Sequence, residues 1–361
     1  MLSRKRILIY SYAGLGDTIL FTPSLRKIKQ LYPDCTISFI TKTVNHHVLK
    51  GLSYIDNVYP FDRGNFFKNI RLVFPLANQD YIFVADWNSR LILLTKILCH
   101  PHISVRLTSK EFKDKTSRKH SSAKFANRHI KKWVLDTQNY AADTINNALS
   151  YALNIPIAAD TENIDVTLPN EKEIQKVNQL MQDNGLLSTD QYICLSPFTS
   201  FEPRNWPLEH ARKLVNLIQN NLHIPVIILG PPSKIGESQK IGGINLVGKT
   251  SFGEMVEFLR RAKLCIGPDS GTMHVAGAID APQIALFSND FPSRWAPKKK
   301  NCRVVSLNLP CIGCRNEGIT ACSTRLCNNG VTPEMVFKIT KEELNRIEMS
   351  LDSNTLLSSL K

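Results

Sequence analysis

Residues 265–274 read Cys-Ile-Gly-Pro-Asp-Ser-Gly-Thr-Met-His and run from a short apolar segment into one with helical spacing. A strand that leads directly into a helix is the repeating unit of α/β proteins. The small residues Ser270, Gly271 and Thr272 would leave backbone N–H groups open at the helix start, which favours a bound anion. This stretch therefore predicts a fold class together with a place for a negatively charged ligand.

The same alternation of short apolar runs and helical segments recurs on both sides of this stretch. Strands are expected at residues 6–10, 36–40, 81–85, 192–196, 225–229, 264–267 and 283–287, with helices such as 22–32 and 208–220 between them. Apolar strands that alternate with helices form parallel sheets covered on both faces. We therefore expect an α/β protein with two doubly wound, Rossmann-like domains that face a central cleft.

The pattern starts at the N-terminus and begins again near residue 192, after a Pro- and charge-bearing segment at 156–172. This restart predicts domains at 1–170 and 171–332. Thr332, Pro333 and Glu334 form a good helix start, with a cap followed by proline at the first helical position. We expect the last segment, 333–361, to form a helix that packs back on the first domain.

The composition of the 361 residues, 43% hydrophobic and 21% charged, excludes a disordered chain and a disulfide-stapled miniprotein. Lys and Arg exceed Asp and Glu by 45 to 31, so the net charge of +14 favours an anionic partner. No apolar run is long enough to cross a bilayer, and the short run after Arg6 argues against export. We expect a cytoplasmic protein, in which the nine cysteines stay reduced or bind metal.

The loop after each domain's first strand carries polar groups that could do chemistry. In the first domain, Gly14 and Gly16 would let the backbone approach a ligand, and Asp17 could either cap the helix or take a proton from a hydroxyl. In the second, Thr199 and Ser200 precede Arg204. A guanidinium suits the oxygens of a nucleotide diphosphate, although a solvated loop arginine is the plain alternative.

Together these loops resemble glycosyltransferase family 9, the ADP-heptose:lipopolysaccharide heptosyltransferases. The resemblance rests on residues 14–25, on the stretch from Pro197 to Pro207 and on residues 267–274, whose order and spacing match over nearly the whole chain. It implies a GT-B fold and an inverting transfer of heptose from ADP-heptose to the lipopolysaccharide inner core, without a cofactor or a required metal. It also implies peripheral attachment at the inner face of the inner membrane.

The resemblance assigns roles to individual residues. Asp17 corresponds to the general base, with Gly16 and Thr18 beside it at the substrate. Arg204 stands where many members have a lysine that neutralises the leaving diphosphate, and Thr199 and Ser200 lie in the same loop. Asp269 would contact the donor sugar. The diphosphate would be held by Ser270, Gly271, Thr272 and His274, although His274 could equally be a packing residue. The loop at 230–233 is placed to meet ribose or adenine.

Much of the positive charge lies between Arg106 and Lys132, a segment with ten basic residues and only two acidic ones, Glu111 and Asp114. A solvated loop and helix surface is one interpretation. The other is a site for a phosphorylated glycolipid acceptor, or adsorption to the anionic membrane surface. A nucleic-acid partner is not expected, because no binding module or aromatic stacking platform is present.

Cys311, Cys314, Cys322 and Cys327 are spaced as a C-x₂-C pair and a C-x₄-C pair. Four thiolates can hold zinc, but the two pairs are closer together than in a common zinc ribbon, so a structural metal stays an open alternative. Cys35, Cys99, Cys194 and Cys265 lie in or beside apolar runs and are expected in the core.

Two rival functions stay open at this stage. One keeps the fold but uses another nucleotide-sugar or another cell-surface glycan acceptor. The other is a basic protein that has lost catalysis and binds only membrane or anionic polymer. A donor screen by calorimetry tests the first rival, and measured donor turnover tests the second.

Overall fold

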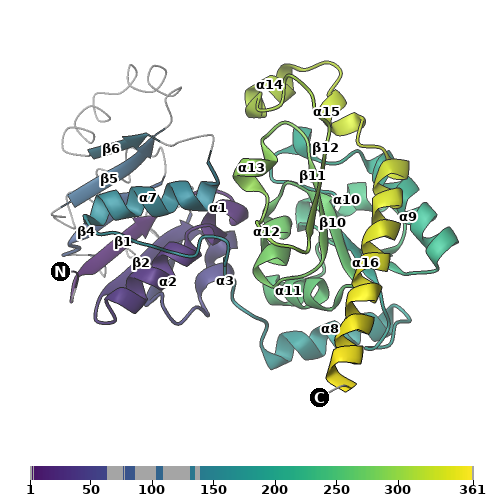
Figure 1. The fold of residues 1–361 in the computed structure, drawn as a ribbon, viewed down its shortest axis with the longest axis horizontal. Coiled ribbons are helices and arrows are strands. Elements are labelled where there is room, and N and C mark those ends of the chain that lie inside the picture. Colours follow the sequence, from purple (N-terminus) through teal and green to yellow (C-terminus); the bar gives the residue numbers. More distant parts are fainter. Residues whose placement is uncertain are drawn as a thin grey trace. The chain divides into compact units, whose positions relative to one another are not determined.

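The protein is described by a computed structural model that covers residues 2, 4–62, 76, 78–85, 103–108, 131–134 and 139–359. The chain forms two compact units, Met1–Thr167 and Leu168–Lys361. Each is a parallel sheet with helices, as Figure 1 shows, and each is described here by itself. Within the part of the chain so described, no helix combines the length and apolar character needed to cross a membrane.

The first unit is built on a six-stranded sheet in the order β3-β2-β1-β4-β5-β6. Every pair of neighbours in it is parallel. Its strands are β1 (Arg6–Tyr10), β2 (Thr36–Lys42), β3 (Asn57–Phe61), β4 (Tyr81–Val84), β5 (Ile103–Thr108) and β6 (Lys131–Val134). Its helices are α1 (Leu15–Ile19), α2 (Thr22–Leu31), α3 (His46–Leu49) and α7 (Ala141–Leu153), with the short 3-10 helix η1 (Thr43–Asn45).

The second unit repeats this topology, with the strand order β12-β11-β10-β7-β8-β9. Its strands are β7 (Ile193–Leu195), β8 (Val226–Ile228), β9 (Ile244–Asn245), β10 (Leu264–Pro268), β11 (Gln283–Phe287) and β12 (Cys302–Ser306). Its helices are α8 (Glu171–Asp183), α9 (Leu208–Leu222), α10 (Ile235–Ser238), α11 (Phe252–Arg261), α12 (Gly271–Ala278), α13 (Pro292–Trp295), α14 (Arg315–Ala321), α15 (Leu326–Asn329) and α16 (Pro333–Ser359). Two 3-10 helices, η4 (Glu202–Arg204) and η5 (Pro232–Lys234), lie in its loops.

In both sheets the strand order reverses between the two central strands, which are β1 and β4 in the first unit and β7 and β10 in the second. Ligands of doubly wound sheets bind at this switch point, beyond the carboxyl ends of the strands. In the second unit the ends of β7 and β10 come so close that a Cβ on Gly267 would lie 2.8 Å from the carbonyl oxygen of Ser196. Glycine at 267 therefore permits the close approach of the two loops that follow.

The core of the second unit explains the place of the last helix. Val336 and Leu344 of α16 are buried in the same apolar cluster as Leu214 and Ile218 of α9, and the two helices lie side by side in Figure 1. The buried face of α16 belongs to the core of its own unit, and packing of residues 333–361 on the first domain stays a prediction.

Several strands were missed by the sequence pattern. β3 contains Pro60 and pairs only with β2, as expected of an edge strand. β9 spans only two residues, and three of the five residues of β12 are exposed. β5 and β6 include Arg106, Lys131 and Lys132, so the two ends of the basic segment lie in strands. Its middle, residues 109–130, lies outside the described residues.

Candidate functional site

Two of the predicted site residues meet at the switch point of the second sheet. Arg204, in the loop after β7, donates a hydrogen bond from Nη1 to Oδ2 of Asp269, which follows β10, across 3.2 Å. The two side chains are only 20% and 11% exposed, so the ion pair is largely shielded from solvent. The buried Nε of Arg204 has no hydrogen-bond partner among the residues that the structure describes. The site thus contains a guanidinium that is paired with Asp269 and has one buried, unused N–H donor.

The loop that carries Arg204 is held by its own polar groups. The backbone N–H of Thr199 donates to Oδ1 of Asn205 at 2.6 Å. The Thr199 hydroxyl donates to the carbonyl of Phe201 at 2.6 Å and accepts from the N–H of the same residue. These contacts give Thr199 a role in shaping the loop, while Ser200 is exposed beside it.

Trp206 lies at the C-terminal end of the same loop. Its side chain is 1% exposed and lies in the core cluster, so Trp206 packs in the interior. Its indole Nε1 donates to the carbonyl of Val331 at 3.0 Å. The Arg204 loop is therefore anchored to the interior on its C-terminal side.

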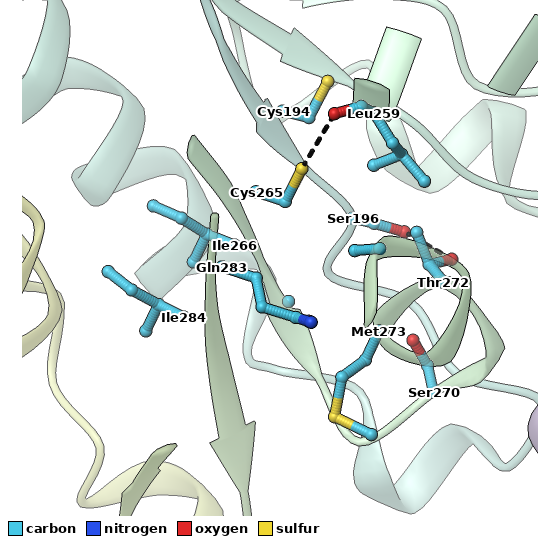
Figure 2. Close-up of a pocket in the computed structure, with 12 residues that line it drawn as sticks. Cys194, Ser196, Leu259, Cys265, Ile266, Ser270, Thr272, Met273, Gln283 and Ile284 are labelled. Atoms are coloured by element: carbon cyan, nitrogen blue, oxygen red, sulfur yellow. Dashed lines mark hydrogen bonds between the residues drawn. The ribbon is translucent and has the colours of Figure 1, made fainter. Parts of the chain in front are cut away.

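The N-terminus of α12 lies at the same switch point. Its N-cap, Ser270, has an extended backbone, and the buried hydroxyl of Ser270 makes no hydrogen bond within the described ranges. Ser196 donates to the Thr272 hydroxyl at 3.4 Å, as drawn in Figure 2. The first N–H groups of a helix have no partner within it, so Gly271 and Thr272 add donors beside the Ser270 hydroxyl. This end of α12 can accept an anion.

His274 cannot supply a positive charge to that anion. It is 3% exposed, and burial lowers its pKa to about 4, so the imidazole is neutral at pH 7. Its Nδ1 has no hydrogen-bond partner in the part of the chain described. The packing interpretation of His274 therefore fits its position better than electrostatic binding of a diphosphate.

The pocket drawn in Figure 2 lies behind α12, between that helix and the strands β7, β10 and β11. Its lining includes Cys194, Cys265 and Met273, and its volume of about 10 Å³ leaves space for about one water molecule. A nucleotide does not fit there. It is a packing gap under the helix, and its lining also includes Ser270 and Thr272 at the start of α12.

Asp17 belongs to the first unit, in the loop and short helix that follow β1. Its Oδ2 accepts a hydrogen bond from the backbone N–H of Gly14 at 3.0 Å, so the carboxylate caps its own helix. The side chain is partly exposed. The capping role that the sequence left open is present, and it fixes the direction of the carboxylate that would act as a base.

The neighbours of Asp17 support this loop from within. Gly16 is buried in α1, and the Thr18 side chain is fully buried. The Thr18 hydroxyl donates to the carbonyl of Gly14 at 2.9 Å and accepts from Nδ2 of Asn45 at 3.1 Å. Asn45 also donates to the carbonyl of Ala13. The Thr18 hydroxyl is thus buried and paired within the protein, where it supports the loop, and a contact of Thr18 with substrate stays a prediction.

The cysteine tetrad gathers on one segment of the second unit. Cys327 is buried, and burial together with the neighbouring thiols Cys314, Cys311 and Cys322 raises its pKa. Across the described ranges, however, no three His, Cys, Asp or Glu side chains are arranged to hold a metal ion. Cys35, Cys194 and Cys265 are buried as expected, and Cys99 lies outside the described residues.

Sequence reasoning missed three asparagines that hold the two loops and a fourth that is buried after β11. Asn45 and Asn205 have the contacts given above, and Asn328 donates to the Arg204 loop. Asn289, directly after β11, is 1% exposed, and its Nδ2 has no partner among residues the structure describes. Their only signal in the sequence is a polar side chain beside a strand end or a turn, which most asparagines share.

Comparison with known proteins gives a consistent result. Residues 105–322 match the family model described as glycosyltransferase family 9 (heptosyltransferase). The chain is 23% identical over 304 residues to lipopolysaccharide heptosyltransferase 3 of Escherichia coli (strain K12), covering 79% of this chain and 83% of that protein.

Two solved structures show the same fold. One is a glycosyl transferase family 9 protein from Veillonella parvula, with a TM-score of 0.78, 21% identity and coverage of 96% of this chain and 99% of that one. The other is E. coli heptosyltransferase WaaC with ADP, with a TM-score of 0.64, 16% identity and coverage of 94% and 99%. The expected GT-B fold class, with two Rossmann-like parallel sheets, is confirmed.

Proposed function

Because this chain belongs to glycosyltransferase family 9, and is therefore a glycosyltransferase, we propose that it transfers a heptose from ADP-heptose to the inner core of lipopolysaccharide. The observation that carries the proposal is the Arg204–Asp269 pair beside the open N-terminus of α12. A cation and free backbone donors at one switch point suit a nucleotide diphosphate that is attached to a sugar.

In this proposal the donor diphosphate lies between Arg204 and the first turn of α12. The guanidinium of Arg204 donates to phosphate oxygens, together with the N–H groups of Gly271 and Thr272. Asp269 accepts from a hydroxyl of the heptose and keeps Arg204 oriented. Ser200, exposed on the same loop, faces the nucleotide.

The chemical step is a single displacement at the anomeric carbon. Asp17 takes the proton of an acceptor hydroxyl as its oxygen attacks, and a new C–O bond forms on the face opposite the leaving group. The bond from the anomeric carbon to the diphosphate oxygen breaks, and its electron pair leaves with ADP. Arg204 and the α12 N-terminus stabilise the charge that develops there. A carboxylate is a weak base at pH 7, so its fixed direction matters.

The acceptor side of the proposal rests on the basic segment. A phosphorylated lipid A and core sugar would meet the positive residues between Arg106 and Lys132, at the cytoplasmic face of the inner membrane. Neutralising Lys113, Lys115, Arg118 and Lys119 together is expected to weaken acceptor use and to leave donor affinity unchanged. Those four side chains lie outside the described residues, so this part is argued from charge alone.

The donor is tested by calorimetry with ADP and UDP, which share the diphosphate and differ in the base. The proposal expects ADP and ADP-heptose to bind more tightly than UDP and UDP-sugars. It also expects Arg204→Ala to raise the Kd of ADP about 10- to 100-fold, which is the usual effect of losing a hydrogen bond from a charged group. Preferential binding of a UDP-sugar would favour the rival in which another donor is used.

A further inference from the structure

Asn328 lies in α15, far from Arg204 in the sequence, yet its side chain reaches the Arg204 loop. Its Nδ2 donates to the carbonyl oxygen of Asn205 at 2.7 Å, with the carbonyl of Pro203 at 3.5 Å. These two carbonyls belong to the residues on either side of Arg204. The Asn328 side chain is 6% exposed, so the contact is made in the protein interior.

A second tie joins the same two segments. Trp206 donates to the carbonyl of Val331, three residues beyond Asn328. The helix α14 also lies against η4, which ends at Arg204. The loop at 203–206 is therefore attached to the segment 328–331 at both of its ends.

The position of Asn328 is itself fixed by the turn that starts α15. Arg325 has a positive φ of 46° as the N-cap of this helix, and its N–H donates to Sγ of Cys322 at 3.3 Å. The backbone N–H of Asn328 donates to the carbonyl of Arg325 at 2.9 Å. The cysteine-bearing segment thus holds the amide that in turn holds the Arg204 loop.

We propose that Asn328 is a positioning residue for Arg204: its buried amide fixes the backbone on both sides of the guanidinium and so presents that cation to the donor diphosphate. The proposal rests on the proposed function, in which Arg204 binds the donor. A guanidinium sits on a long side chain with several rotamers, so a fixed backbone at its base reduces the ordering that ligand binding requires. Asn328 itself touches no substrate.

Two substitutions separate the amide from the shape of the residue. Asn328→Asp keeps the size but replaces the donating NH₂ with an oxygen that faces two carbonyls, and Asn328→Ala removes the group. Asn329→Ala is the matched control, because Asn329 is exposed in the same helix and donates to the carbonyl of Thr324, away from the Arg204 loop. Each variant is first compared with the wild type by thermal unfolding.

The readouts are the Kd of ADP by calorimetry, the KM and kcat with ADP-heptose, and a double-mutant cycle with Arg204→Ala. Both Asn328 variants are expected to raise the Kd and the KM about three- to tenfold, with a smaller change in kcat, and Asn329→Ala is expected to match the wild type. In the Arg204→Ala background, Asn328→Ala should add less than about twofold, since its effect passes through Arg204.

These measurements distinguish a failure of the proposed role of Arg204 from a failure of the proposed role of Asn328. If Arg204→Ala binds ADP as the wild type does, the proposed role of Arg204 is wrong and this inference falls with it. If Arg204→Ala weakens ADP but the Asn328 variants behave like Asn329→Ala, or their effect is undiminished in the cycle, only the inference is overturned.

A measurement on the wild type covers the case in which the Asn328 variants do not fold. The backbone amides of 204–206 and of 328–331 should gain protection from hydrogen exchange together when ADP is added. Protection at 204–206 with none at 328–331 contradicts the coupling.

Discussion

The guanidinium of Arg204 and the carboxylate of Asp269 form an ion pair, with 3.2 Å between Nη1 and Oδ2, across the two central strands of the second sheet. A donor diphosphate would therefore meet a cation that already has an anionic partner. A carboxylate repels phosphate but also keeps the guanidinium oriented. The two effects can be separated by changing the charge of Asp269 alone.

Asp269→Asn is expected to leave the Kd of ADP within about twofold or to tighten it, because the repulsion is lost while the amide oxygen still accepts from Arg204. The KM for ADP-heptose should rise about tenfold, since the proposed contact with the sugar loses a charge-assisted hydrogen bond. Calorimetry and initial rates measure the two quantities. A loss of ADP affinity as large as that of Arg204→Ala would mean that Asp269 serves only to orient Arg204.

His274 makes the stability of the second unit depend on pH. Burial lowers its pKa to about 4, so between pH 6.5 and pH 4 the unfolded chain binds more protons than the folded one. Stability therefore falls as the pH drops through this window, by about 2 to 3 kcal/mol at pH 4.5 from this group. His274→Gln should remove that part of the loss. Urea unfolding of both proteins at pH 7 and pH 4.5 measures it, and equal pH dependence would refute the buried neutral state.

Asp17→Asn tests whether the carboxylate does more than cap α1. The Asn oxygen can still accept a hydrogen bond from the N–H of Gly14, so the free energy of unfolding should change by less than about 1 kcal/mol. The kcat should fall about 10²- to 10⁴-fold with unchanged ADP affinity, because the amide cannot take the acceptor's proton. A variant with near-normal kcat would leave Asp17 as a cap alone.

Cys322 should be alkylated more readily than Cys327, five residues further along the chain. It is exposed, and hydrogen bonds from the Thr324 hydroxyl and the Arg325 N–H lower its pKa. Cys327 is buried, and burial raises its pKa. Because the thiolate is the nucleophile, a limited dose of iodoacetamide should label Cys322 first. Mass spectrometry of the digested protein measures the order, and earlier labelling of Cys327 would contradict it.

Periodicity alone was enough to predict the parallel sheets and the loops that follow their central strands. β7, β10 and β11 are short and wholly apolar or nearly so, because both faces of the sheet are covered, and such runs stand out in a sequence. β3 and β6 did not stand out, since edge strands can carry proline and charged residues, and β5, which pairs with β4 and β6, contains Arg106.

The predicted site was only partly recoverable from the sequence, for a physical reason. The topology indicates which loops can bind a ligand. Whether a side chain in such a loop is already hydrogen-bonded within the protein depends on burial and pairing, which the sequence does not show. Thr18 and Thr199 look like ligand groups in a sequence, and their hydroxyls are used within the protein. Asn328 looks like any turn residue, and its contact spans 123 positions.

The central claim is tested most directly by incubating the purified protein with ADP-heptose and inner-core acceptors of defined length, and following the acceptor by mass spectrometry together with ADP release. The account predicts that one acceptor gains a single heptose residue for each ADP released. Transfer from a UDP-sugar, with no reaction of ADP-heptose on any inner-core acceptor, would contradict it.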